Sequence, residues 1–232
     1  MRRHTIRLIL FSIIALFHLA LSNEKKDGDN EDEDEIIEPP SINYDKFAKD
    51  ADKESNFIES PLVCGDFYEL TAITADGNPY SFEKLRGKIT LVVNIASQYG
   101  LMDRTYFDLV NLQQAYSPTR LFNVVAFPCF EFVNSGAPVL STTVRQFLID
   151  NYGANFAIFD TVHCQGPEIS EVFRFLSHEA KTNVPLWNFW KFLIGPDGHL
   201  VTLMSSQQTV SGLSKRIEEI MHEIIVQHRE EL

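Results

Sequence analysis

Cysteine is scarce in this 232-residue chain, which has only three, at positions 64, 129 and 164. An odd number leaves at least one thiol unpaired within the chain, and Cys64 and Cys164 could bond to each other or be free. The sequence also lacks a Cys-X-X-Cys pair, a glycine-rich phosphate loop and the His-Glu-X-X-His pattern of zinc proteases. We therefore expect no bound metal and no bound cofactor.

Basic residues are few. Lysine and arginine number 20 against 32 aspartates and glutamates, for a formal net charge of −12. This balance argues against a nucleic-acid partner, because phosphate backbones attract positive charge. The acidic residues are concentrated before residue 60, in a segment with little hydrophobicity. Like charges at this density cannot form a packed core, so residues 23–60 are predicted to be a solvated, disordered tail.

No apolar run reaches the roughly 20 residues that a membrane-crossing helix needs. The apolar stretch Leu8–Leu21 follows three arginines and ends in small residues, which is typical of a secretory signal peptide over residues 1–22. A signal anchor is the alternative. At the other end, Arg229–Leu232 reads Arg-Glu-Glu-Leu, a variant of the KDEL-type retrieval signal, although a charged helix end would look the same. Together these signals predict the lumen of the endoplasmic reticulum, with secretion as the alternative.

The rest of the chain, residues 61–228, has enough apolar residues for one domain with one substantial core. Residues Phe67–Ile73 and Asn78–Phe82 flank an Asp-Gly turn and predict an N-terminal β-hairpin. The β-branched run Ile89–Ile95 and the run Phe122–Phe127 predict two buried strands. A helix from Asp103 to about residue 116 lies between them, so the three elements form a βαβ unit with parallel strands.

Later segments complete an α/β pattern. Helices are predicted from Ser141 to Gly153, over Pro167–Glu179 and over Val210–His228. Phe192–Ile194 and Leu200–Met204 predict an antiparallel pair of strands. The expected architecture is a mixed central sheet flanked by helices, which resembles the thioredoxin fold.

Three segments resemble the glutathione peroxidase family in order and spacing: KITLVVNIASQYG at 88–100, FNVVAFPCFEF at 122–132 and WNFWKFLIGPDG at 187–198. The resemblance covers nearly the whole chain after residue 63 and is closest to the ER-resident members of the family. It implies a thioredoxin-like fold and reduction of hydroperoxides by a thiolate or selenolate, with glutathione or a protein dithiol as reductant. The short connection His178–Pro185 also resembles that of the ER-resident members and lacks the longer segment that tetrameric relatives use for assembly, so a monomer is expected.

The sequence departs from the family at its central residue. Tyr99 stands where the resemblance implies a peroxide-attacking cysteine or selenocysteine. A phenol has a pKa of about 10 and forms no counterpart of sulfenic acid, so the substitution removes the first step of the reaction. Trp187 and Asn188 match two supporting positions, whereas Glu131 replaces the family's glutamine. We predict that the Tyr99 hydroxyl donates a hydrogen bond to Glu131.

Three functions remain open. The first is a catalytically impaired lumenal homologue that acts through partners of oxidative folding, such as protein disulfide isomerase. The second is a weak thiol peroxidase that uses Cys129, which the resemblance marks as a candidate resolving thiol. The third is an acidic lumenal binding protein that works through its tail.

Overall fold

The computed structural model describes residues 64–96, 104–131, 140–181, 183, 185 and 187–230. The predicted signal peptide, the acidic tail, Tyr99 and the last two residues of the chain lie outside this part. Within it, no helix combines the length and the hydrophobicity needed to cross a bilayer.

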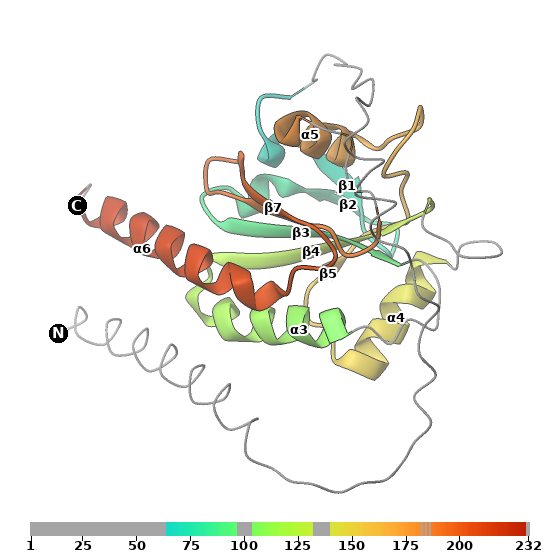
Figure 1. Ribbon diagram of the computed structural model, residues 1–232, viewed down its shortest axis with the longest axis horizontal. Helices are drawn as coiled ribbons and strands as arrows, with labels where there is room; N and C mark the ends of the chain where they lie inside the picture. The colour runs from blue at the N-terminus through green and yellow to red at the C-terminus, as the bar shows by residue number, and fades with distance from the viewer. Residues whose placement is uncertain are drawn as a thin grey trace, which may run out of the picture. The chain divides into compact units, whose positions relative to one another are not determined.

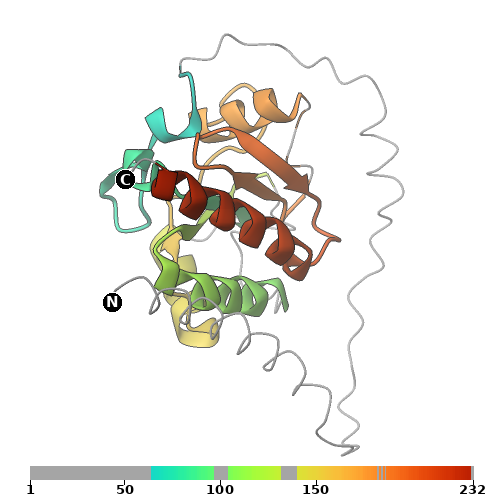
Figure 2. The same ribbon diagram turned by 90° about the vertical axis from the view of Figure 1, so that its left-hand side faces the viewer.

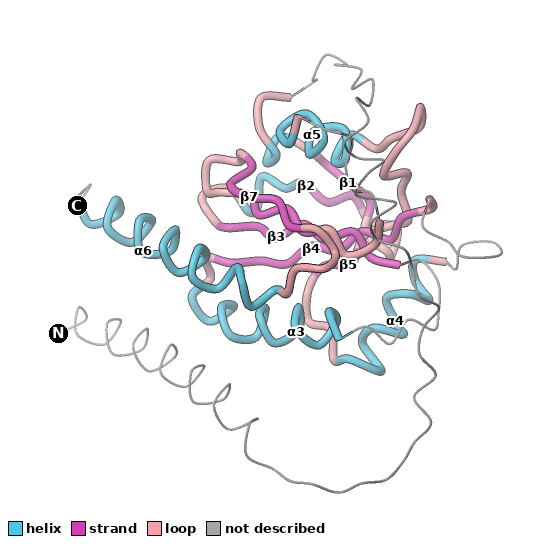
Figure 3. Tube along the Cα trace, in the orientation of Figure 1, coloured by secondary structure: helices cyan, strands magenta, loops and turns pink. Residues whose placement is uncertain are grey.

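One five-stranded sheet forms the centre of the domain, with the strand order β5-β4-β3-β6-β7 (Figures 1 and 3). The central strand β3 pairs parallel with β4 and antiparallel with β6, which confirms the predicted mixed sheet and the parallel βαβ unit. The strands are β3 (Ile89–Ala96), β4 (Phe122–Cys129), β5 (Ala157–Ile158), β6 (Lys191–Ile194) and β7 (Leu200–Met204).

Helices α3, α4 and α6 cover one face of the sheet, and Figure 2 shows α3 and α6 running next to each other. Their bounds are Arg104–Tyr116, Ser141–Tyr152 and Ser214–Glu230. The odd-numbered residues of β3, Leu91, Val93 and Ile95, are fully buried in the core on this side. Because side chains alternate along a strand, the even-numbered residues of β3 face the other side.

Helix α5 (Glu171–Ala180) lies on the opposite face (Figure 1). Val92 of β3 and Phe127 of β4 join it in a second, strongly aromatic cluster, which we call the α5-side core. The Phe127 ring stacks on Phe159 with 4.5 Å between centroids. Burial on both faces explains why β3 and β4 are continuous apolar runs in the sequence.

The N-terminal hairpin is confirmed but shorter than predicted. Its strands are β1 (Thr71–Ile73) and β2 (Pro79–Ser81), paired antiparallel. The prediction that the first strand begins at Phe67 is wrong, because Phe67–Glu69 forms a 3₁₀ helix (η1). Asp66 caps that helix by accepting a hydrogen bond from the Tyr68 N–H at 2.8 Å, and a side-chain cap of this kind favours helical over extended backbone.

Two helix boundaries and one short strand also differ from the predictions. Helix α5 begins at Glu171 rather than at Pro167, because Ser170 is its N-cap and accepts a hydrogen bond from the Phe173 N–H. The predicted last helix begins with a 3₁₀ turn, Val210–Leu213 (η4), before α6. The edge strand β5 was not predicted at all, since its two residues are too few for any periodic pattern.

Candidate functional site

The candidate site lies at one edge of the sheet, at the carboxyl ends of β3 and β4. Ala96 and Cys129, the last residues of these two parallel strands, lie opposite each other in the register. Open α/β sheets commonly bind ligands at this edge. Tyr99 follows three residues after Ala96 and lies outside the described residues, so its predicted hydrogen bond to Glu131 stays a prediction.

Asn94 positions the segment that contains Trp187 and Asn188. Its side chain is fully buried, donates from Nδ2 to the Trp187 carbonyl at 2.8 Å and accepts at Oδ1 from the Trp190 N–H at 2.9 Å. The Asn94 carbonyl also accepts from the Phe189 N–H at 2.7 Å. These bonds hold Phe189 in a left-handed conformation, with φ of 65°, which is unfavourable for a residue other than glycine.

Trp187 is half-buried against the α5-side core, and Asn188 is almost completely buried. The side-chain amide of Gln165 donates to the Pro185 carbonyl, which joins the start of this segment to the stretch after β5. The structure therefore places Trp187 and Asn188 at the same edge of the sheet as Cys129, on a turn held by hydrogen bonds from the side chain and main chain of Asn94.

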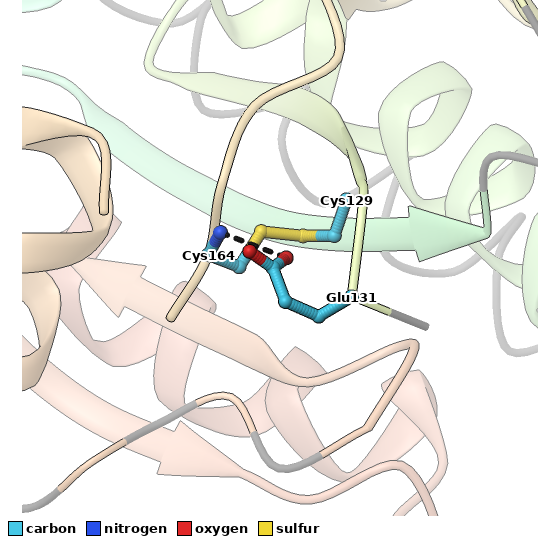
Figure 4. Close-up of side chains that lie close together, drawn as sticks. All are labelled: Cys129, Glu131 and Cys164. Atoms are coloured by element: carbon cyan, nitrogen blue, oxygen red, sulfur yellow. Dashed lines mark hydrogen bonds between the residues drawn. A yellow bond between two sulfur atoms is a disulfide. The ribbon is translucent and has the colours of Figure 1, made fainter. Parts of the chain in front are cut away.

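Cys129 forms a disulfide with Cys164 (Figure 4). The two Cα atoms are 5.8 Å apart, within the range of ordinary disulfides, and both side chains are fully buried. Cys129, the possible redox thiol of the sequence analysis, is therefore oxidised in this structure. Cys164 is neither free nor bonded to Cys64. The parallel bridge between Cys129 and Val162 brings the two cysteines together although they are 35 residues apart in sequence.

Glu131 lies beside this disulfide (Figure 4). Its Oε2 accepts a hydrogen bond from the Cys164 N–H at 3.0 Å, and its Oε1 lies 2.9 Å from His163 Nδ1. The other ring nitrogen of His163 lies 3.2 Å from a Glu168 carboxylate oxygen, and the ring packs on Phe130. Glu131 thus anchors the stretch after β5 to the end of β4.

Cys64 is the free cysteine of the structure and is half-buried. Burial, followed by the negative charges of Glu69 and Asp66, raises the pKa of its thiol. A raised pKa lowers the fraction of thiolate, which is the nucleophilic form. Cys64 therefore lacks the environment of an activated nucleophile.

The sequence did not single out His163 or Asn94, and it did not pair Cys129 with Cys164. Asn94 could have been noticed as a polar residue within a run otherwise suited to complete burial, since buried amides need partners. Nothing comparable marks His163 or the disulfide, because both depend on how β5 places the stretch that follows it.

The strand order, the helices on both faces and the disulfide at the carboxyl edge define a thioredoxin-like α/β protein. Among solved structures, the chain is similar to T. cruzi GPX1, with a TM-score of 0.57 and 25% identity, over 68% of this chain and 97% of that one. A second crystal structure, of Trgpx in apo form, gives the same TM-score at 23% identity. These likenesses confirm the fold.

The chain belongs to the glutathione peroxidase family. The family model described as glutathione peroxidase matches residues 67–177. Probable glutathione peroxidase 8 of Homo sapiens is 37% identical over 166 residues, which is 72% of this chain and 78% of that protein. Glutathione peroxidase 7 of Mus musculus is 35% identical over 167 residues, 72% of this chain and 88% of that protein.

Proposed function

We propose that this chain is a glutathione peroxidase family member that has lost the family's standard peroxidase reaction and acts through partners of oxidative folding. The observation that carries the proposal is Tyr99, which occupies the position of the peroxide-attacking residue. Attack on a peroxide oxygen requires an atom that can be oxidised to a sulfenic or selenenic acid and then reduced, and a phenol oxygen cannot do this.

The surroundings also disfavour an anionic nucleophile. The family's glutamine can donate a hydrogen bond to a thiolate, whereas the Glu131 carboxylate only accepts hydrogen bonds when it is ionised. Its negative charge would also raise the pKa of an acidic group placed beside it. The hydrogen bonds that Glu131 accepts from Cys164 and shares with His163 give this carboxylate a structural role instead.

The disulfide argues against the alternative in which Cys129 attacks the peroxide as a lone nucleophile. A sulfur bonded to Cys164 has no thiolate to attack a peroxide, and both cysteines are fully buried. The alternative would require prior reduction of this bond.

We place this function in the lumen of the endoplasmic reticulum, with protein disulfide isomerase-type oxidoreductases as partners. The apolar segment Leu8–Leu21 and the Arg-Glu-Glu-Leu sequence support the compartment. A compartment that keeps disulfides oxidised is compatible with the Cys129–Cys164 bond.

Peroxide consumption tests the lost reaction. Purified wild-type protein, supplied with hydrogen peroxide and either glutathione or reduced protein disulfide isomerase, is expected to consume no peroxide above the uncatalysed rate. The double variant Tyr99→Cys with Glu131→Gln is expected to gain measurable consumption, because it restores a thiol and a hydrogen-bond donor. Wild-type turnover at rates comparable with an active relative assayed alongside would refute the proposal.

Cysteine mapping separates the proposal from the Cys129 alternative. The protein is reduced and exposed to peroxide, and the oxidation of each cysteine is followed by mass spectrometry. Rapid sulfenylation of Cys129 that disappears in Cys129→Ser would favour the alternative, with Cys64→Ser as the matched control. Direct titration with purified protein disulfide isomerase then tests the partner, and absence of binding would contradict that part of the proposal.

A further inference from the structure

We propose that reduction of the Cys129–Cys164 disulfide opens a Zn²⁺ site formed by the two cysteine sulfurs and the Glu131 carboxylate. The ligand atoms of these three side chains all lie within 4.8 Å of one another. This proposal does not depend on the proposed function, because it concerns the reduced form of the two cysteines and involves no peroxide.

The three side chains are close enough to share one metal ion once the two sulfurs, which are bonded to each other in this structure, move apart. Zinc binds thiolate sulfur at about 2.3 Å and carboxylate oxygen at about 2.0–2.2 Å, so its ligand atoms lie roughly 3.5–4 Å apart. The three atoms already converge on one point from the end of β4 and the stretch after β5 (Figure 4). Once the disulfide is broken, the two sulfurs have to separate from bonding distance to about 3.5–4 Å, and their Cα atoms are already 5.8 Å apart.

The ligand types select zinc over the harder cations. Thiolates favour Zn²⁺ and other soft ions, whereas Mg²⁺ and Ca²⁺ prefer sites made of oxygen alone. Two sulfurs and one carboxylate supply three of the four positions that zinc fills, and water completes the fourth. The two thiolates balance the charge of Zn²⁺, and the carboxylate adds one further negative charge to the site.

The reaction balances with a dithiol as reductant. The dithiol breaks the Cys129–Cys164 bond by thiol–disulfide exchange, gives two protein thiols and is itself oxidised to a disulfide. Zn²⁺ then replaces the two thiol protons, which are released to solvent as two metal–sulfur bonds form.

The Glu131 carboxylate is already held in place by hydrogen bonds, and it lies on the side from which a metal ion can approach the two sulfurs. Hydrogen bonds between Glu131 and both His163 and the Cys164 N–H fix the position of its oxygens, as is common for metal-binding carboxylates. The two cysteines are fully buried, whereas the side chains of Glu131 and His163 are 21% and 40% exposed. An ion can therefore reach the sulfurs from the Glu131 side.

Metal titration of the full chain tests the site. The protein is reduced, freed of reductant without oxygen, and titrated with Zn²⁺ against a chromogenic chelator and with Co²⁺ by absorption spectroscopy. We expect one equivalent of metal per chain and a Co²⁺ spectrum with thiolate charge-transfer bands. The oxidised protein, which has the same sequence and fold, is expected to bind no metal at this site. Thiolate bands also separate this site from weak binding by exposed carboxylates.

Variants assign the ligands. Cys129→Ser and Cys164→Ser are each expected to abolish the thiolate bands of the two-sulfur site, and Glu131→Gln to weaken binding about tenfold or more, because a neutral amide oxygen is a poorer zinc ligand than a carboxylate. Cys64→Ser is the matched control and should bind like the wild type. The proposal is overturned if the reduced wild type binds no stoichiometric metal, if oxidised and reduced protein bind equally, or if Cys164→Ser keeps full affinity.

Discussion

Asn94 is the single residue on which the Trp187–Trp190 turn depends most directly. Its side chain makes one hydrogen bond to the carbonyl at the start of the turn and one to the N–H at the end. Because Asn94 is completely buried, water cannot replace these bonds when the amide is lost.

Asn94→Ala is expected to lower the free energy of unfolding by about 2–6 kcal/mol, since it leaves two main-chain groups without partners at about 1–3 kcal/mol each. Urea unfolding followed by tryptophan fluorescence measures this, and the same emission reports any rearrangement around the two tryptophans. Asn111→Ala, at an exposed position of α3, is the control and should change stability by less than about 0.5 kcal/mol. A variant as stable as this control would show that the turn is held by other contacts.

Glu131 is a residue whose chemical effect could be predicted from sequence but whose contacts could not. The sequence identified it as a substitution that opposes thiolate chemistry, and the structure shows which groups its carboxylate contacts. Its residue type could be interpreted from sequence, but its partners could not, because His163 and Cys164 come from a stretch more than 30 residues away.

Among the structural elements, η1, η2 (Phe82–Leu85) and the turn between β6 and β7 are joined through Asp66. The Asp66 carboxylate accepts from the Tyr68 N–H at 2.8 Å and from Arg86 Nη1 at 2.9 Å. Gly198 lies so close that a Cβ at this position would be 2.7 Å from Asp66 Oδ1, and its φ of 88° also favours glycine. The N-terminal segment is thereby fixed against the second antiparallel pair.

Asp66 should make part of the stability pH-dependent. Burial by itself raises its pKa, but the hydrogen bonds from Arg86 and the Tyr68 N–H outweigh this effect and lower the pKa below the ordinary value. A lowered pKa in the folded state stabilises the protein above the unfolded value of about 3.9, and this contribution is lost as pH falls through the folded-state pKa. Asp66→Asn is therefore expected to be less stable than the wild type at neutral pH, with the difference shrinking in acid.

Urea unfolding between about pH 6 and about pH 2.5 spans the range in which an aspartate with a lowered pKa titrates. Glu223→Gln, an exposed position on α6, serves as the control and should show no comparable trend. A stability difference for Asp66→Asn that stays constant across this range would contradict the assignment.

For the whole molecule, the disulfide is the covalent link between the end of β4 and the stretch that leads to α5. It spans 35 residues of sequence, and constraining the unfolded chain over such a loop is worth about 3–4 kcal/mol in the chain-entropy model. Both ends lie in the α5-side core, so the folded protein keeps its apolar packing when the bond is broken.

Reduction in the presence of a chelator is therefore expected to lower the free energy of unfolding by about 3–4 kcal/mol without unfolding the domain. Urea unfolding of oxidised and reduced protein measures the difference, and circular dichroism monitors the fold. Cys64→Ser should show the same difference, because Cys64 takes no part in the bond. Equal unfolding midpoints in the two redox states would contradict a disulfide that stabilises the domain.

The sequence by itself determined the main elements and their arrangement, because short apolar runs rich in β-branched residues at β3 and β4 are typical of strands buried on both faces. Local patterns could not decide the short elements. The side-chain cap from Asp66 turns an apolar stretch into η1, and Ser170 rather than Pro167 begins α5. The presence of Tyr99 at the position that the family resemblance assigns to the peroxide-attacking residue was also determined by sequence alone.

Only the tertiary structure decided which cysteines pair and what Glu131 contacts. Sequence separation carries no information about the distance between Cys129 and Cys164, which is set by the parallel pairing of β4 with β5 and the bridge to Val162. Contacts between distant segments follow from packing and register rather than from the local preferences of the residues that make them.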